Sequence, residues 1–107
     1  MISDEDVENA LDFLRKNARE AAKARAEREY LDNYSRVLKS VIMRENSSES
    51  LGAQEAIAYS DKRYITHLEA LKMATEHDEY IRWGKVAAEA RIEAWRTMCS
   101  NERANKV

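Results

Sequence analysis

The sequence predicts an all-α protein in which two long helices pair as an antiparallel, coiled-coil-like hairpin with a short helix at the turn. The 107 residues contain no proline and two glycines, and 36% of them are charged, a composition typical of long helices. Apolar residues recur at alternating steps of three and four, which is the heptad spacing of paired helices. One polar segment, 46–52, interrupts this pattern near the middle of the chain and supplies the turn.

The first long helix is expected to span about residues 3–46 of a single helical domain that covers the whole chain, 1–107. Ser3 followed three residues later by Asp6 is a helix-start signature, and the neighbouring carboxylates suit the positive end of the helix dipole. The first heptad stripe is Val7, Leu11, Leu14, Ala18 and Ala21. Arg25 interrupts this stripe. We therefore expect the inward stripe to shift to Ala22, Ala26, Tyr30, Tyr34, Val37 and Val41, and to be widened downstream by Leu31, Leu38 and Ile42.

Residues 47–60 are expected to form a loop and a short helix, about Ala53 to Tyr59, after the glycine at position 52. Ser60 and Asp61 then offer a cap for the second long helix, about 61–101, and residues 102–107 are expected to be a frayed tail. The inward stripe of the second long helix is expected to be Tyr64, Leu68, Leu71, Ala74, Ile81, Ala88, Ile92, Trp95 and Cys99.

The position of the turn sets the expected register of the two long helices. A turn centred near residue 55 would place Ala22 opposite Ala88 and Tyr30 opposite Tyr80, so that small residues meet small ones and large residues meet large ones. A second stripe on the second helix includes Tyr80, Trp83 and Ala87. Two apolar faces on one helix indicate two packing partners, and we therefore expect a homo-oligomer with this second stripe at the subunit contact.

No residue pattern indicates catalysis, a cofactor or a metal ion. His67 and His77 do not share a helix face, and Cys99 lies on the apolar stripe, where a packed thiol is the expected state. The sequence therefore predicts a protein that is not an enzyme. A single cysteine fits a reducing compartment, and no apolar run is long enough to cross a membrane. The expected location is the cytoplasm.

Five basic residues crowd the first helix and form the candidate nucleic-acid-binding set, the basic set: Arg15, Lys16, Arg19, Lys23 and Arg25. Steps of four place Arg15, Arg19 and Lys23 along one side of a helix. Repeated around an oligomer, this strip would follow the phosphates of single-stranded nucleic acid. The alternative is a solvated face of intrahelical ion pairs, because glutamates are interleaved with the basic residues. The net charge of −2 gives no basic excess over the whole chain.

The second half of the chain carries a family resemblance in its pattern of residues. The pattern is Ala58-Tyr59-Ser60-Asp61, Tyr64, Tyr80-Ile81-Arg82-Trp83 and a closing Ile92-Glu93-Ala94-Trp95-Arg96. The segment resembles small helical bacteriophage proteins and, more distantly, the recombination mediator family of T-even phages. That resemblance implies an oligomer that binds single-stranded DNA and helps to load a recombinase against single-strand-binding protein. The acidic start of this chain departs from the basic N-terminal element of the mediators.

Two other functions fit the same residues. A phage accessory protein without a role on DNA, for example one that blocks a host factor, needs only a helical surface for protein contacts. A purely structural coiled-coil scaffold needs only the heptad stripes.

Overall fold

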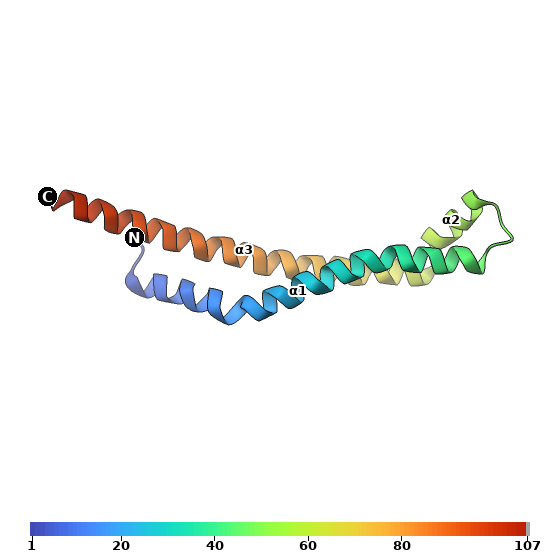
Figure 1. Cartoon of the computed structure of the whole chain (residues 1–107), viewed down its shortest axis with the longest axis horizontal. Coiled ribbons are helices and arrows are strands. Elements are labelled where there is room, and N and C mark those ends of the chain that lie inside the picture. The colour runs from blue at the N-terminus through green and yellow to red at the C-terminus, as the bar shows by residue number, and fades with distance from the viewer. Residues whose placement is uncertain (107) are drawn as a thin grey trace. The chain divides into compact units, whose positions relative to one another are not determined.

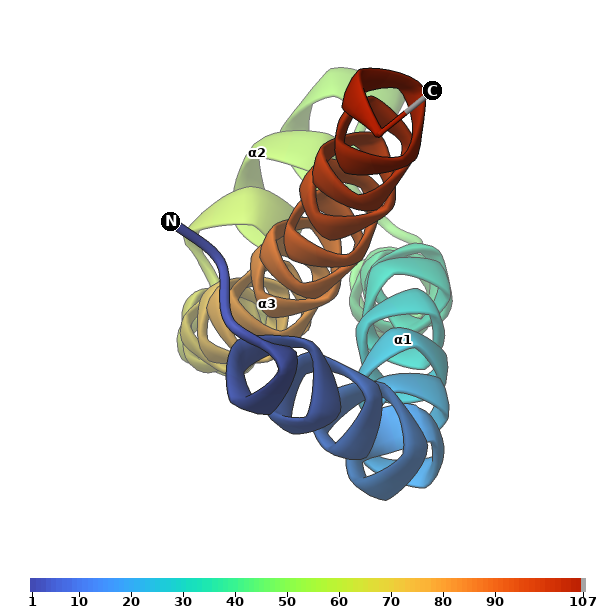
Figure 2. The same ribbon diagram turned by 90° about the vertical axis from the view of Figure 1, so that its left-hand side faces the viewer.

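The computed structural model describes residues 1–106 and contains three helices: α1 (Asp4–Glu45), α2 (Leu51–Ser60) and α3 (Lys62–Asn105). Both views show α1 and α3 as unbroken helical ribbons (Figure 1, Figure 2). No strand occurs within residues 1–106. The all-α class and the short helix at the turn are therefore confirmed. α3 continues to Asn105 instead of fraying after Asn101, because Glu102, Arg103 and Ala104 are good helix formers. Residue 107 lies outside the described residues.

The expected single domain divides into two compact units. The terminal unit joins Met1–Ala22 to the segment that begins at Glu79, and the central unit is Lys23–Asp78. In each unit a part of α1 pairs with an antiparallel part of α3. The contacts show the direction: in the central unit Arg28 meets Asp78, whereas Glu45, farther along α1, meets Arg63 near the start of α3.

The start of α1 is held by a reciprocal cap in the terminal unit. The backbone N–H of Ser3 donates to Asp6 Oδ2 at 2.9 Å, and the backbone N–H of Asp6 donates to Ser3 Oγ at 3.1 Å. The hydrogen bonds from Ser3 also hold the pKa of the Asp6 carboxyl below its ordinary value. The predicted helix start is thus confirmed, and two amide groups that the helix itself leaves without partners are satisfied.

The core of the terminal unit is narrow. Val7 and Ala10 from α1 are buried, as are Ile81 and Ala88 from α3. The Phe13 ring packs over Gly84: a Cβ atom at position 84 would lie 2.6 Å from Phe13 Cζ. Glycine therefore lets this part of α3 accept an aromatic ring that a side chain there would displace.

The central unit has a third helix in its packing. α2 lies alongside the last turns of α1 and the first turns of α3 (Figure 1), and its Ala58 is fully buried with Leu38 and Ile42. Met43, Ile57 and Tyr64 pack around this cluster. The side chain of Ser50 caps α2 by accepting a hydrogen bond from the backbone N–H of Ala53. The cap sets the start of α2 at Leu51, two residues earlier than expected.

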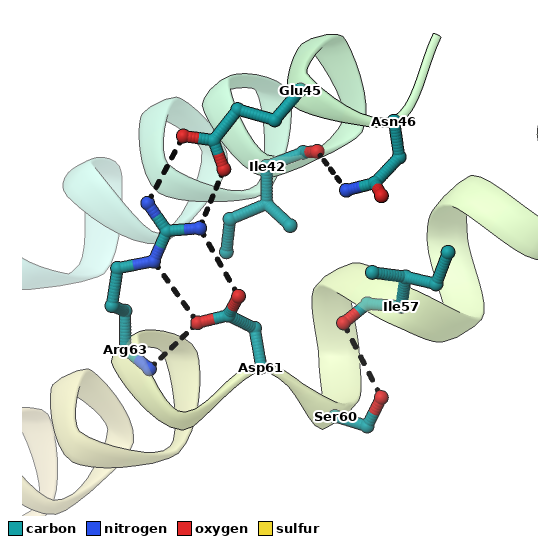
Figure 3. Close-up of polar contacts among 7 residues, drawn as sticks. All are labelled: Ile42, Glu45, Asn46, Ile57, Ser60, Asp61 and Arg63. Atoms are coloured by element: carbon teal, nitrogen blue, oxygen red, sulfur yellow. Dashed lines mark hydrogen bonds and ion pairs between the residues drawn. The ribbon is translucent and has the colours of Figure 1, made fainter. Parts of the chain in front are cut away.

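Arg63 ties the junction of α2 and α3 to the end of α1. Its guanidinium lies between the carboxylates of Glu45 and Asp61 (Figure 3), with Nη2–Oε1 and Nε–Oδ1 distances of 2.6 and 3.1 Å. The Asp61 carboxylate also accepts the backbone N–H of Arg63 at 2.8 Å, which caps α3. Hydrogen bonds from Arg63 hold the pKa of both carboxyls below their ordinary values.

The expected shift of the α1 stripe is wrong. In the central unit the buried and half-buried seam has heptad spacing through Ala24, Arg28, Leu31, Ser35, Leu38 and Ile42, and of these Leu31, Leu38 and Ile42 face inward as expected. Polar residues occupy inward positions because they find polar partners on α3: Arg28 pairs with Asp78, and Ser35 with His67. The shifted set faces solvent instead: Ala22, Ala26, Tyr30, Tyr34, Val37 and Val41 are all exposed.

The predicted register is wrong for the same reason. Ala22 is exposed and cannot form a close crossing with the buried Ala88. Tyr30 and Tyr80 are 63% and 79% exposed, so neither belongs to a shared core. Leu68, expected inward on α3, is also exposed, and the neighbouring His67 is buried in its place. The hydrogen-bonded pairs across the central unit fix the actual register.

Candidate interaction surfaces

The interior of the central unit contains two separate groups of polar contacts between α1 and α3. Arg28 Nη1 lies 3.1 Å from Asp78 Oδ2, and the Asp78 side chain is only 10% exposed. His67 Nε2 lies 2.7 Å from the Leu31 carbonyl oxygen and 2.8 Å from Ser35 Oγ. A carbonyl oxygen can only accept, so Nε2 carries the proton and donates.

The hydrogen bonds of Ser35 and His67 hold α1 against α3. The Ser35 hydroxyl donates to the same Leu31 carbonyl at 3.3 Å, so it is not free to act as a nucleophile. Within residues 1–106 every buried side-chain nitrogen and oxygen has a hydrogen-bond partner. Sequence reasoning missed His67 and Asp78 as inward residues, although an unbroken heptad count from Tyr64 through Leu71 and Ala74 would have reached both.

No group of three or more His, Cys, Asp or Glu side chains among residues 1–106 is placed to hold a metal ion. None of the helices in that range combines the length and hydrophobicity that crossing a bilayer requires. Cys99 is half-buried as a free thiol in the terminal unit.

All five members of the basic set are exposed, as nucleic-acid binding requires. Arg15, Lys16 and Arg19 belong to the terminal unit, and Lys23 and Arg25 to the central unit. Arg15 pairs with Asp12 one turn away, and Arg25 Nε lies 2.8 Å from a carboxylate oxygen of Glu29. These are the intrahelical ion pairs that the solvated-face alternative expects.

The predicted oligomer contact also lies on an exposed surface, which we call the α3 face: Tyr80, Trp83 and Ala87. Tyr80 is 79% exposed and Trp83 is 60% exposed, both in the terminal unit. The Arg82 guanidinium lies 5.2 Å from the centre of the Trp83 ring and Arg82 Nε bonds to Glu79 at 2.9 Å. Arg82 and Glu79 thus lie beside the α3 face, while Tyr80 and Trp83 stay exposed.

A second exposed surface, the α1 face, consists of Tyr30, Tyr34, Val37 and Val41 in the central unit. The two tyrosine rings stack with their centres 6.1 Å apart, and the inner edge of Tyr34 contacts His67 with ring centres 5.4 Å apart. A shallow hollow beside Val37 and Val41 is also lined by Arg36, Ser40, Arg44 and Glu45. Sequence reasoning placed these residues in the core, so this surface was not among the predicted sites.

No protein-family model, no curated protein and no solved structure matches this chain. The resemblance to phage recombination mediators therefore stays a hypothesis, and any function must be argued from the surfaces described above.

Proposed function

We propose that this chain is a non-enzymatic interaction protein that works by binding other protein chains through exposed helix faces. The observation that carries the proposal is the exposure of Tyr80 and Trp83 on one face of α3. Tyrosine and tryptophan are the residues that most often dominate protein–protein binding energy, and leaving such rings in water is unfavourable. The α3 face is accordingly the proposed contact with another subunit, in the cytoplasm.

The interior of the protein supports an interaction role over a catalytic one. The buried His67 donates to the Leu31 carbonyl oxygen and the buried Asp78 accepts from Arg28, so α1 engages both side chains. An antiparallel helix pair with a satisfied interior is a rigid support, and a rigid support reduces the entropy lost when its surface binds.

The fluorescence of Trp83 tests the proposed contact. In a Trp95→Phe background, Trp83 is the sole tryptophan, and its emission should shift to shorter wavelength as protein concentration rises through the association range. Tyr80→Ser should abolish the shift and leave the melting temperature unchanged, because Tyr80 is 79% exposed. Met73→Ser, at a residue 71% exposed elsewhere on α3, is the matched control. An emission maximum that stays constant with concentration would overturn the α3 contact.

The second candidate function is that of a phage recombination mediator that binds single-stranded DNA and assists recombinase loading. The observation that favours it is the exposure of the whole basic set, together with tyrosines on the same helix. One protomer offers few charges, so binding would depend on an oligomer that repeats the strip and adds its phosphate contacts. A recombinase and single-strand-binding protein would then be its partners.

Fluorescence anisotropy with a labelled single-stranded oligonucleotide separates the two functions. Replacing Arg15, Arg19 and Lys23 together by alanine should weaken binding and flatten its salt dependence, by about 0.7 in log–log slope for each phosphate that is no longer neutralised. A triple alanine variant of other exposed arginines is the matched control: Arg91, Arg96 and Arg103. Absence of binding at low salt would remove the DNA function. Binding that responds equally to both triple variants would remove only the site.

A further inference from the structure

The α1 face is an uncovered apolar stripe on a helix that already buries a different stripe. Tyr30, Val37 and Val41 are 63%, 53% and 45% exposed, and Tyr34 is 38% exposed. The seam of the central unit occupies other positions of α1, from Ala24 to Ile42. α1 therefore carries two heptad stripes, and the protomer itself covers only one of them.

The spacing of the residues in the α1 face is the same in both directions along the helix. Its residues follow one another at steps of four, three and four. An exposed charged residue lies three positions beyond each end of the face: Glu27 before Tyr30 and Arg44 after Val41. A two-fold rotation of the helix about an axis between positions 35 and 36 places Tyr34 at the level of Val37 and Tyr30 at the level of Val41. The same operation exchanges Glu27 with Arg44, which are of opposite charge.

We propose that the α1 face is a homodimer interface in which two copies of α1 pack antiparallel about a two-fold axis. Each tyrosine then lies against a valine of the second copy, so that large side chains meet small ones in every apolar layer. Glu27 of each copy meets Arg44 of the other at both ends of the interface. A two-fold contact of this kind is closed, because each copy uses the same surface.

Charge selects this arrangement over a parallel one. In a parallel pair Glu27 would meet Glu27 and Arg44 would meet Arg44, and like charges at facing positions are repulsive. The paired stripe spans roughly 25 Å of helix, at about 1.5 Å per residue. Such an interface is at the small end of the range for specific contacts, so we expect a dissociation constant on the order of micromolar.

This inference rests on the proposed function only in that the chain works by association, and it uses a different helix from the α3 face. The two contacts can fail separately. Tyr80→Ser should leave the α1 dimer intact, and a change at Val37 should leave the Trp83 emission shift intact.

Charge reversal in a Tyr80→Ser background, which lacks the α3-face contact, tests the antiparallel pairing by sedimentation equilibrium. Glu27→Arg or Arg44→Glu alone should weaken the dimer about tenfold or more, because each creates two like-charge contacts. The double reversal should restore the wild-type dissociation constant. Circular dichroism melting checks that each chain is folded. A wild-type chain that is monomeric at high micromolar concentration, or a double reversal no tighter than the single ones, would overturn the proposal.

An apolar-to-charged change tests the location of the interface. Val37→Glu places a charge in the centre of the stripe and should weaken the dimer about tenfold or more. Met73→Glu is the matched control, because Met73 is 71% exposed in the same unit and lies on α3. Equal effects of the two changes on dimerisation would show that the α1 face is not the interface.

Discussion

Adding one methyl group at Gly84 tests the packing of the terminal unit. A Cβ there would lie 2.6, 3.2 and 3.5 Å from three atoms of the Phe13 ring. The first distance is far inside van der Waals contact, so the ring has to move out of its half-buried position. Gly84→Ala therefore changes the free energy of unfolding in two opposite ways: the clash with Phe13 lowers it and the higher helix propensity of alanine raises it.

The two effects differ in sign and have known sizes. Alanine in place of glycine inside a helix stabilises by about 1 kcal/mol, whereas overpacking costs about 1–3 kcal/mol. We expect a net effect between neutrality and a loss of about 2 kcal/mol in the free energy of unfolding, measured by urea denaturation. In a Phe13→Ala background the clash is absent, and Gly84→Ala should then stabilise by about 1 kcal/mol. The coupling free energy of the two changes should be about 1–3 kcal/mol.

Gly52 provides the matched control, because a Cβ built at that position meets no atom within 4 Å. Gly52→Ala in α2 should stabilise the protein, by up to about 1 kcal/mol, with or without the Phe13 ring. The reasoning is refuted if Gly84→Ala stabilises the wild-type chain as much as Gly52→Ala does, or if its effect is the same in the Phe13→Ala background.

Three further predictions concern stability. Arg28→Ala should lower the free energy of unfolding by urea by about 2 kcal/mol, because it leaves the nearly buried Asp78 carboxylate without its ion-pair partner. Arg25→Ala removes only an exposed ion pair and should lower it by less than about 0.5 kcal/mol. The two carboxylates that Arg63 holds have lowered pKa values, so their contribution is present above the ordinary values of 4.5 and 3.8 and is lost as the pH falls below them. Arg63→Gln should therefore lessen the loss of stability between pH 7 and pH 3 in urea titrations, and equal losses in both chains would contradict this. Ala88→Leu should overpack the terminal unit and lower stability by about 1–3 kcal/mol, and an unchanged melting temperature would count against that core.

Local features were predictable from the sequence because their causes are local. The cap at Ser3 and Asp6 depends on residues three apart, and the class of the fold follows from composition and the absence of proline. The turn was placed by a polar segment with a glycine. These features depend on residues close to one another in the sequence and can be predicted without knowing how the partner helix packs.

The seam and the register were not predictable in this way. Arg28 reads as a surface residue until Asp78, 50 residues away, is placed opposite to it. The same holds for Ser35, whose partner His67 is 32 residues away. Without those partners, the more apolar stripe of α1 looks like the core. The α1 face was therefore assigned inward, whereas the basic set and the α3 face are exposed and their binding roles stay predictions.

The central claim is that this chain works by association through an exposed helix face, and a mixture of two charge variants tests it most directly. Chains with Glu27→Arg carry arginine at both ends of the α1 face, and chains with Arg44→Glu carry glutamate at both ends. Both variants are made in a Tyr80→Ser background, which removes the α3-face contact, and in sedimentation equilibrium each variant alone should then behave mainly as the 12.4 kDa protomer. An equimolar mixture should sediment as a heterodimer of twice that mass, because both ends again pair opposite charges. A mixture that remains monomeric, or single variants that dimerise as tightly as the wild type, would contradict the account.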